Sequence, residues 1–404
     1  MNIAVAQSGG PTCAINASLA GVFCAGAKSP EIEKIYGSLN GIEGIIEDRL
    51  ADMSELLKSE EDIELLKRTP SSALGSCRRK LPDHEKDSAV YEKITDCFRK
   101  YDIGMFFYIG GNDSMDTVAK LSRYYAEKSI DIKVVGIPKT IDNDLCGTDH
   151  CPGFGSAAKY VAATVQEITR DSNVYSAPSV TVIETMGRHA GWLTAASGCI
   201  RANGESAPHL IYLPETVFSD EKFIADVREQ MKLHKAVIAV VSEGVRTADG
   251  RFAAESHQSS KTDAFGHSYL SGIGKYLENL VSDKIGCKVR SIELNVMQRC
   301  SSHLASLTDI EESQRIGSAA VESALNGKTG CMMGFKRLSS NPYLSEIVDI
   351  SAETAANNEK FFPSEWITPE GNNITDEAVS YVMPLIQGEL PPVMKNGMPR
   401  HIIF

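Results

Sequence analysis

The sequence places an amine, a hydroxyl and two carboxylates within one stretch of six residues. Lys139, Thr140, Asp142 and Asp144 follow an apolar run (132–137) that ends at a proline. Such a run is typical of a buried strand whose carboxyl end opens into a loop, and open α/β sheets bind ligands at these strand ends. Carboxylates beside an amine suit the transfer of a metal-bound phosphate to a hydroxyl. The same residues could instead form a turn in which Asp and Asn side chains only cap their own backbone.

Two further stretches combine a strand pattern, a glycine turn and a helix pattern. Glycines let backbone N–H groups approach an anion at the start of a helix, so this order is one way to bind phosphate. The second turn also places Asn112 and Asp113 at the helix start, where Ser114 could act as the N-cap. Neither turn has the G-x-G-x-x-G motif of dinucleotide-binding proteins or a Walker A motif. A plain strand–helix connection is therefore an equally good interpretation. The two units are strand 3–7, Gly9-Gly10, helix 15–28, and strand 105–109, Gly110-Gly111, helix 115–128.

Positive charge is concentrated locally in a chain whose net charge is −12. Three consecutive cations begin at Arg78, shortly after a Gly-Ser turn, and could clamp phosphate. Arg188 follows the end of another apolar strand pattern, where it could bind a sugar phosphate or a carboxylate. Arg290 lies inside a predicted strand (287–294), so it should be paired or should reach a ligand. Structural roles at turns and in solvent remain the alternative for these cations.

The composition is that of an ordinary globular protein, with 42% hydrophobic and 23% charged residues among 404. No run of 18 apolar residues predicts a membrane span, and the first residues lack the basic region and cleavage site of a signal peptide. The ten cysteines form no C-x-x-C pair, which favours free thiols in a reducing compartment. The negative net charge argues against a general nucleic-acid binder. We therefore expect a cytoplasmic protein without membrane or nucleic-acid partners.

Strand patterns alternate with helix patterns along most of the chain. This alternation predicts the α/β class with parallel, doubly wound sheets, whose strand ends would bring the polar groups described above to one edge. One amphipathic helix is predicted over 54–68, an exposed polar loop over 246–268 and a late helix over 376–387. Residues 336–404 contain many Pro and Asn residues and predict an extension that packs on the core.

A set of short motifs shares one order and spacing along the chain, and the most specific are T-I-D-N-D (140–144) and M-G-R (186–188). The others are 8–10, 75–78, 110–114, 138–139, 147–149, 242–244 and 298–299. Together they resemble the phosphofructokinase family over residues 1 to about 335. The resemblance implies the phosphofructokinase fold, with two doubly wound, Rossmann-like domains and parallel-rich sheets. It implies a phosphoryl-donor domain at 1–145 completed by part of 300–335, a sugar-phosphate domain at 146–299, and a C-terminal extension at 336–404.

The resemblance also implies roles for single residues on the donor side. Asp142 would be the general base that takes the proton from the 1-hydroxyl of fructose 6-phosphate. Asn112 and Asp144 would hold Mg²⁺, although Asn112 lacks the charge of the Asp that the family often has there. Lys139 and Asp113 would take part in catalysis. The phosphoryl donor would be bound by Gly10, Arg78, Gly111 and Lys139.

On the acceptor side, the resemblance implies a larger set that binds the sugar phosphate. Its members are Thr140, Ile141, Asp142, Met186, Gly187, Arg188, Glu243, Arg290 and Arg299. In this family a neighbouring subunit supplies one of the arginines. Arg290 therefore implies a homo-oligomer, either a dimer or a tetramer.

The phosphoryl donor depends on two positions. ATP-using relatives carry Gly at both, whereas this chain has Asp113 and Lys139, a pair that resembles the pyrophosphate-dependent branch. A carboxylate at 113 would fill the room of a nucleotide α-phosphate and repel its charge. Lys139 would neutralise charge on the transferred group. We therefore predict reversible, Mg²⁺-dependent transfer from pyrophosphate to fructose 6-phosphate, giving fructose 1,6-bisphosphate and phosphate.

Several alternatives stay open beside this prediction. The chain could be an ATP-dependent phosphofructokinase, or a catalytically silent sugar-phosphate-binding regulatory subunit. It could also be a lipid or dinucleotide kinase, which the two specific motifs disfavour. The acceptor is open too, because Val296-Met297 replace a His that relatives often have and 173–179 lacks a cation found in many of them. We keep sedoheptulose 7-phosphate as a second candidate acceptor.

Overall fold

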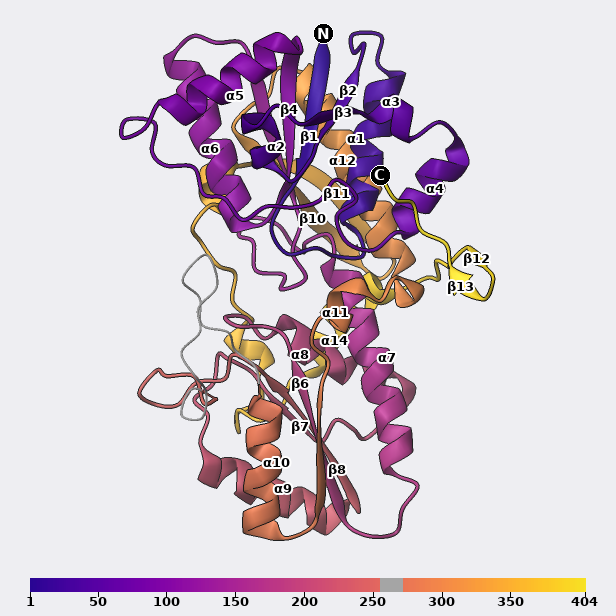
Figure 1. Cartoon of the computed structure of the whole chain (residues 1–404). Coiled ribbons are helices and arrows are strands. Elements are labelled where there is room, and N and C mark those ends of the chain that lie inside the picture. The colour runs from indigo at the N-terminus through magenta and orange to yellow at the C-terminus, as the bar shows by residue number, and fades with distance from the viewer. Residues whose placement is uncertain (255–271) are drawn as a thin grey trace. The chain divides into compact units, whose positions relative to one another are not determined.

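The computed structural model describes residues 1–254 and 272–404, which divide into two compact units (Figure 1). Unit 1 comprises Met1–Ser156, Arg299–Glu359 and Gly388–Phe404, and unit 2 comprises Ala157–Gln298 and Lys360–Gln387. Residues 146–156, which we expected at the start of the sugar-phosphate domain, cluster with unit 1. The expected extension (336–404) is divided between the two units. The part of the expected polar loop beyond residue 254 lies outside the described residues.

Unit 1 is built on a seven-stranded sheet with the order β11-β10-β5-β4-β1-β2-β3. The strands are β1 (Asn2–Gln7), β2 (Ile35–Ser38), β3 (Leu50–Asp52), β4 (Ile103–Gly110), β5 (Lys133–Pro138), β10 (Cys331–Ser340) and β11 (Tyr343–Ser351). The neighbouring pairs from β10 to β2 run parallel, and β3 and β11 pair antiparallel at the two edges. Successive residues of β4 enter different cores, since Phe106 joins one apolar cluster and Phe107 the other. Burial on both faces explains the continuous apolar run and confirms the α/β, parallel-rich class.

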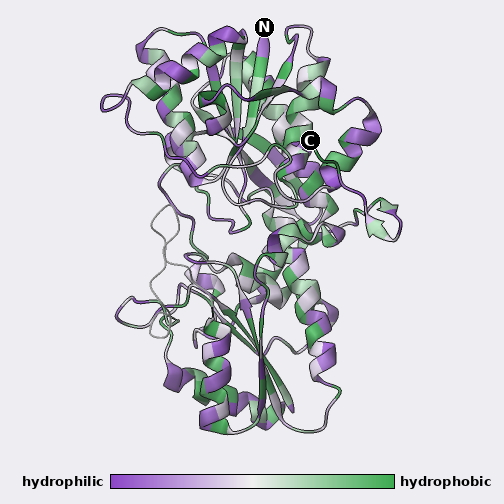
Figure 2. Cartoon of the chain, viewed as in Figure 1, coloured by the Kyte–Doolittle hydropathy of each residue, from purple (hydrophilic) through white to green (hydrophobic). Residues whose placement is uncertain are grey.

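Helices cover both faces of this sheet (Figure 1). One cluster joins the sheet to α2 (Ile42–Ile46), α5 (Ala89–Lys100) and α6 (Asn112–Glu127). The other joins it to α1 (Ile15–Lys28), α3 (Met53–Leu56), α4 (Glu60–Arg68) and α12 (Leu307–Leu325). The hydropathy colouring shows apolar strands inside and purple, polar stretches on the outer helices (Figure 2). The remaining elements of unit 1 are η3 (Ser302–Leu304), α13 (Ala352–Ala355), β12 (Met394–Lys395) and β13 (Met398–Pro399).

Helices α1 and α12 cross at very close range. A Cβ added to Gly21 would lie 2.1 Å from the Gln314 carbonyl oxygen, and one added to Gly317 would lie 2.1 Å from the Ser18 carbonyl oxygen. Only glycine allows this approach. The close crossing packs α12 directly against α1, the helix that follows the Gly9-Gly10 turn.

Two expectations about helix ends were wrong. The helix expected over 54–68 is interrupted, because Ser59 begins α4 with a capping box in which Ser59 and Asp62 each bind the other's backbone N–H. Helix α6 begins at Asn112 with Gly111 as the N-cap residue, so Ser114 is not the cap. The Ser114 hydroxyl instead contacts the Ser8 hydroxyl, a partner from the end of β1 that local sequence could not reveal.

Unit 2 contains a four-stranded parallel sheet with the order β7-β8-β6-β9. Its strands are β6 (Ser179–Thr185), β7 (Leu210–Tyr212), β8 (Ala236–Ser242) and β9 (Lys288–Glu293). Helices α9 (Asp220–Leu233) and α10 (Ile273–Ile285) share an apolar core with it. The other elements are α7 (Phe154–Ser172), which begins in unit 1, α8 (Trp192–Ala196), η1 (Ser197–Asn203), η4 (Ser364–Trp366), α14 (Asp376–Val382) and η5 (Met383–Ile386). The short α11 (Met297–Cys300) spans the boundary between the units.

The late segment of unit 2 packs on α8 through aromatic rings. The Trp192 ring lies 5.0 Å from Phe362, 6.1 Å from Trp366 and 5.2 Å from Tyr381, measured between centroids. In the ranges 1–254 and 272–404, no helix combines the length and apolar character needed to cross a lipid bilayer.

Candidate active site

The loop after β5 carries the chemical groups that the sequence indicated. Lys139 N–H donates to the Gly110 carbonyl at 2.9 Å, which fixes the loop to the end of β4. Thr140 Oγ1 accepts from the backbone N–H of Asp142 at 3.1 Å, and buried Asn143 Oδ1 accepts from Cys151 N–H at 3.0 Å. Thr140 thus caps its own turn, whereas Asn143 bonds to a backbone N–H eight residues further along the chain instead of capping its own turn. The Asp142 carboxyl, by contrast, is half-buried and belongs to a loop that its neighbours hold in shape.

The Lys139 ammonium lies against the glycine turn that follows β1. Its Nζ donates to the Gly10 carbonyl at 2.6 Å, and the side chain is only 3% exposed. Gly9 has φ 76°, a backbone shape that favours glycine, and a Cβ there would lie 3.1 Å from this Nζ, so a side chain would crowd the ammonium. Burial lowers the pKa of Lys139 to about 8, although the charges of Asp142 and Asp144 act to raise it.

Two arginines extend this positive cluster. The segment that carries Arg78 is fixed to the glycine turn, because Gly9 N–H donates to the Cys77 carbonyl at 3.1 Å and Ser76 Oγ donates to the Gly9 carbonyl at 2.7 Å. Arg299 places its guanidinium 3.4 Å from the position of a Cβ on Gly10. The charges of Arg78 and Arg299 both act to lower the pKa of Lys139. Arg299, which the resemblance assigned to the sugar phosphate, thus lies beside the residues assigned to the donor.

The Asp113 carboxylate lies in the first turn of α6 and is paired. Lys80 Nζ lies 2.8 Å from Asp113 Oδ1, and the two side chains are 54% and 41% exposed. Gly111, the N-cap residue, approaches the Lys139 backbone, since a Cβ on it would be 3.7 Å from the Lys139 carbonyl oxygen. The sequence showed Lys80 only as the last of three consecutive cations. Only the folded structure shows that Lys80 pairs with Asp113.

The expected metal ligands differ in their surroundings. With its amide oriented to satisfy its hydrogen bonds, Asn112 donates to the Ala355 carbonyl at 2.6 Å and to the Asn358 carbonyl at 3.1 Å. In that orientation the amide nitrogen is used by the two carbonyls, so Oδ1 is the Asn112 atom that could bind a metal. Within the part of the chain that the structure describes, no group of three or more His, Cys, Asp or Glu side chains could hold a metal ion. Mg²⁺ is usually held by one or two carboxylates together with substrate phosphates, so Asp144 and Asn112 Oδ1 fit its preference for oxygen ligands.

In unit 2, the ends of two neighbouring strands bring several expected sugar-phosphate residues together. Gly187, after β6, has φ 133° and donates its N–H to Glu243 Oε1 at 3.3 Å. Ser242 Oγ, at the end of β8, donates to the Gly187 carbonyl at 2.6 Å. Met186 N–H donates to Gln298 Oε1 at 3.1 Å. The M-G-R turn and Glu243 are therefore neighbours, as parallel strands predict.

Within this chain, Arg290 does not lie beside the M-G-R turn and Glu243. It lies on the edge strand β9 in register with Thr181, five residues before Met186, which corresponds to about 16 Å along the strand. Its NH1 donates to Asp171 Oδ2 at 3.0 Å, so the expectation that an Arg in this strand is paired is met.

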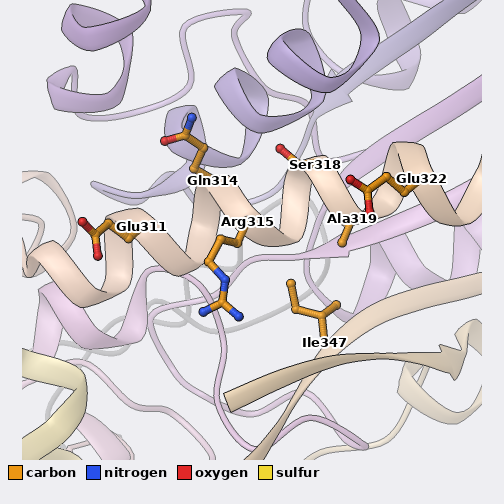
Figure 3. Close-up of a pocket in the computed structure, with 7 residues that line it drawn as sticks. All are labelled: Glu311, Gln314, Arg315, Ser318, Ala319, Glu322 and Ile347. Atoms are coloured by element: carbon orange, nitrogen blue, oxygen red, sulfur yellow. The ribbon is translucent and has the colours of Figure 1, made fainter. Parts of the chain in front are cut away.

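A separate surface cavity of about 530 Å³ lies between α12 and β11 (Figure 3). Its lining residues are Glu311, Gln314, Arg315, Ser318, Ala319, Glu322 and Ile347. None of the residues expected to do chemistry lines it. The face of α12 that lines this cavity is also distinct from the buried Asp309 and Glu312 of the same helix.

Comparison with known proteins gives consistent matches over nearly the whole chain. The family model described as phosphofructokinase matches residues 2–324. A protein of Methylococcus capsulatus named pyrophosphate–fructose 6-phosphate 1-phosphotransferase is 42% identical over 99% of this chain and 95% of its own length. A sulfofructose kinase of Alkalicoccus urumqiensis is 33% identical over 91% of this chain and 92% of its own length. The crystal structure of a pyrophosphate-dependent phosphofructokinase from Marinobacter aquaeolei has a TM-score of 0.88 and 38% identity, covering 99% of this chain and 95% of that one.

The fold and these matches define an α/β phosphotransferase. The chain belongs to the phosphofructokinase family.

Proposed function

We propose that this enzyme reversibly transfers a phosphoryl group from pyrophosphate to the 1-hydroxyl of fructose 6-phosphate, with Mg²⁺, giving fructose 1,6-bisphosphate and phosphate. The observation that carries the proposal is the buried Lys139 ammonium on the Gly10 carbonyl, with Asp113 in the first turn of α6. The names of the relatives from Methylococcus capsulatus and Marinobacter aquaeolei support the same donor.

The donor side of the proposed mechanism relies on charge. Lys139, Arg78 and Arg299 form a positive cluster beside Gly10 that neutralises the transferred and leaving phosphates, and backbone groups at Gly10 and Gly111 allow close approach. Family members use a divalent metal; Asp144 and Asn112 would hold Mg²⁺ here, and the bound ion would add to the neutralisation of phosphate charge. Asp142 accepts the proton of the attacking hydroxyl, a contribution of roughly 10²- to 10⁴-fold for a general base.

Selection of pyrophosphate over ATP rests on Asp113. Its carboxylate occupies the first turn of α6, where the helix N-terminus would otherwise attract a phosphate. A further nucleotide phosphate placed there would meet a like charge. Pyrophosphate has no such third phosphate, so its two phosphoryl groups can use the Lys139 cluster alone.

A donor-swap assay tests this function. Initial rates are measured with pyrophosphate and with ATP at equal concentration, with fructose 6-phosphate as the acceptor. We expect a pyrophosphate rate that exceeds the ATP rate by at least a hundredfold, and we expect Asp142→Asn to remove it. Activity with ATP and none with pyrophosphate would refute the proposed donor, while an active Asp142→Asn variant would refute the proposed base.

A second proposal concerns the acceptor. A relative named sulfofructose kinase, 33% identical over 91% of this chain, indicates that this scaffold can serve a differently substituted sugar. The sequence also leaves the acceptor open, because Val296-Met297 replace a His that relatives often have. Fructose 6-phosphate, sedoheptulose 7-phosphate and sulfofructose are therefore compared in the same assay, and the largest kcat/KM assigns the acceptor.

Assembly and location remain predictions. The position of Arg290, remote along the strand from Met186 and Glu243, supports a role in a neighbouring subunit and hence a homo-oligomer. Light scattering of the purified chain measures the subunit number. A cytoplasmic location is consistent with the ten free cysteines.

A further inference from the structure

Two buried carboxylates of α12 hold the segment that returns from the catalytic loop to α7. Asp309 and Glu312 are each 4% exposed and lie one turn apart. Asp309 accepts the backbone N–H groups of Gly153 and Ser156, both at 2.9 Å. These bonds fix the far end of the loop to a helix that is itself locked against α1.

His150 forms the second attachment. Its Nε2 lies 2.7 Å from Glu312 Oε2, and its Nδ1 lies 2.8 Å from Asp149 Oδ1. The residue is 3% exposed, and its ring is stacked on Phe335 with centroids 4.6 Å apart and planes 1° from parallel. With both ring nitrogens facing carboxylates, the ring can satisfy both only as a doubly protonated imidazolium.

The charges around the ring support that protonation state. Burial alone would lower the pKa of His150, but the hydrogen bonds to Asp149 and Glu312 outweigh it and raise the pKa. From β10, Arg337 Nε donates to Asp149 at 3.1 Å, and from β11 the Tyr343 hydroxyl donates to Glu312 at 2.9 Å. Two cations thus balance these two carboxylates, and each carboxylate has a second donor.

Asp309 is the remaining charged group that faces the ring from α12. Burial raises the pKa of Asp309, while its hydrogen bonds and the nearby His150 act to lower it. The two nitrogen edges of the ring therefore face carboxylates, and one face of the ring stacks on Phe335.

A short covalent and hydrogen-bonded path joins this cluster to the reacting groups. Cys151, the residue after His150, donates its backbone N–H to Asn143 Oδ1 at 3.0 Å. Asn143 is buried, adopts φ 55° and lies directly between Asp142 and Asp144. A shift of His150 therefore moves the partner that holds the bend carrying both carboxylates.

We propose that His150 and Glu312 are positioning residues for phosphoryl transfer: their buried imidazolium–carboxylate pair fixes, through Cys151 and Asn143, the geometry of Asp142 and Asp144. This inference rests on the proposed function, because it gives Asp142 its role as the base. It goes beyond that function by assigning the catalytic loop a support from a helix about 160 residues further along the chain.

The test compares four single variants. His150→Phe keeps an aromatic ring over Phe335 and removes both N–H groups, whereas His150→Gln keeps one amide donor. Glu312→Gln keeps the shape and removes the charge. Glu311→Gln is the matched control, since Glu311 is the preceding residue of the same helix, is exposed and lines the surface cavity instead of the loop.

We expect His150→Phe and Glu312→Gln to lower kcat by about 10- to 100-fold, because misplacement of a reacting group by about 1 Å can cost a factor of 10². The KM for pyrophosphate should change by less than about threefold, since Lys139, Arg78 and Arg299 are untouched. His150→Gln should recover part of kcat, and Glu311→Gln should match the wild type. A purely structural role would lower the melting temperature and leave kcat of the folded fraction unchanged, and that result would overturn the proposal.

Two further measurements cover the remaining outcomes. If His150→Phe does not fold, the kcat of the isosteric Glu312→Gln variant tests the positioning role, and hydrogen exchange of the Cys151 amide should be faster in that variant than in the wild type. Asp142→Asn is assayed in parallel. An inactive Asp142→Asn beside fully active His150 and Glu312 variants refutes the positioning role alone, whereas an active Asp142→Asn refutes the assignment of Asp142 as the base, on which the positioning role rests.

Discussion

The Lys139 ammonium donates to the Gly10 carbonyl at 2.6 Å, so an amine from the end of β5 and the turn after β1 form one positive site. Because burial lowers the pKa of Lys139 to about 8, the free enzyme loses this charge as the pH rises through that value. We predict that kcat/KM for pyrophosphate falls on the alkaline side with an apparent pKa near 8. The profile is measured between about pH 6 and pH 11, a range that includes both the lowered and the ordinary lysine pKa of about 10.4.

Lys139→Arg is the control for this profile. Arginine keeps its charge throughout that range, so the alkaline fall should move to higher pH even if the maximal rate is lower. Pyrophosphate also titrates in this range, but its titration affects the profiles of both enzymes equally. An alkaline limb at the same pH in Lys139→Arg would show that another group causes it.

Lys80 should modulate donor binding through Asp113. Removing its charge by Lys80→Gln leaves Asp113 less neutralised, so we expect kcat/KM for pyrophosphate to fall about two- to fivefold, more at low salt than at high salt. The pair is about half exposed, and such surface pairs contribute only about 0–1 kcal/mol, so the free energy of unfolding should hardly change. Lys86→Gln, at an exposed position six residues on, is the control. Equal effects of the two variants would argue against the Asp113 contact.

Gly9 should not tolerate a side chain. Gly9→Ala imposes a strained positive φ that costs about 1–2 kcal/mol and places a Cβ 3.1 Å from Lys139 Nζ. We expect a lower free energy of unfolding together with a higher KM for pyrophosphate. Gly250→Ala is the matched control, because Gly250 has φ 82° with nothing within 4 Å of its Cβ. It should share the strain and leave the KM unchanged; a shift of KM in both variants would contradict the steric argument.

The buried pair of His150 and Glu312 makes stability depend on pH in a defined window. His150 has a raised folded pKa, so its contribution is complete below the unfolded value of about 6.5 and is lost as the pH rises through the folded pKa. Glu312 has a lowered folded pKa, since hydrogen bonds from His150, Ser345 and Tyr343 outweigh the effect of burial. Its contribution is present above about 4.3 and is lost as the pH falls through the folded pKa.

The wild type should therefore exceed Glu312→Gln in free energy of unfolding most clearly between about pH 4.5 and 6.5. Breaking a buried ion pair typically costs about 3–5 kcal/mol, which sets the expected difference. Urea unfolding of both proteins across pH 4 to 9 measures it. A difference that does not vary with pH would rule out a charged pair.

Arg290 should act in the site of a second chain. Arg290→Ala is expected to raise the KM for the sugar phosphate with little effect on the KM for pyrophosphate. In mixed oligomers of Asp142→Asn and Arg290→Ala chains, one type of site combines Asp142 of one chain with Arg290 of the other. Activity should therefore recover when the two variants are refolded together, and no recovery would place Arg290 outside any shared site.

Local patterns were sufficient for much of the fold and for the residue types of the site. The apolar runs before Gly110 and Lys139 predicted β4 and β5, because strands buried on both faces cannot alternate. The M-G-R turn and Glu243 met as expected, since the carboxyl ends of neighbouring parallel strands share an edge. The helix over 54–68 failed at Ser59, where a capping box outweighed a continuous helical period.

Local sequence patterns were enough to predict which chemical groups follow which strands, because strand, turn and helix preferences act over a few residues. The partners of those groups depend on tertiary packing. Lys139 meets Gly10 across 129 positions and His150 meets Glu312 across 162, and these distances depend on strand order and on the crossing of α1 with α12. Contacts between distant segments arise from the packing of whole elements, so no local pattern around either residue contains them.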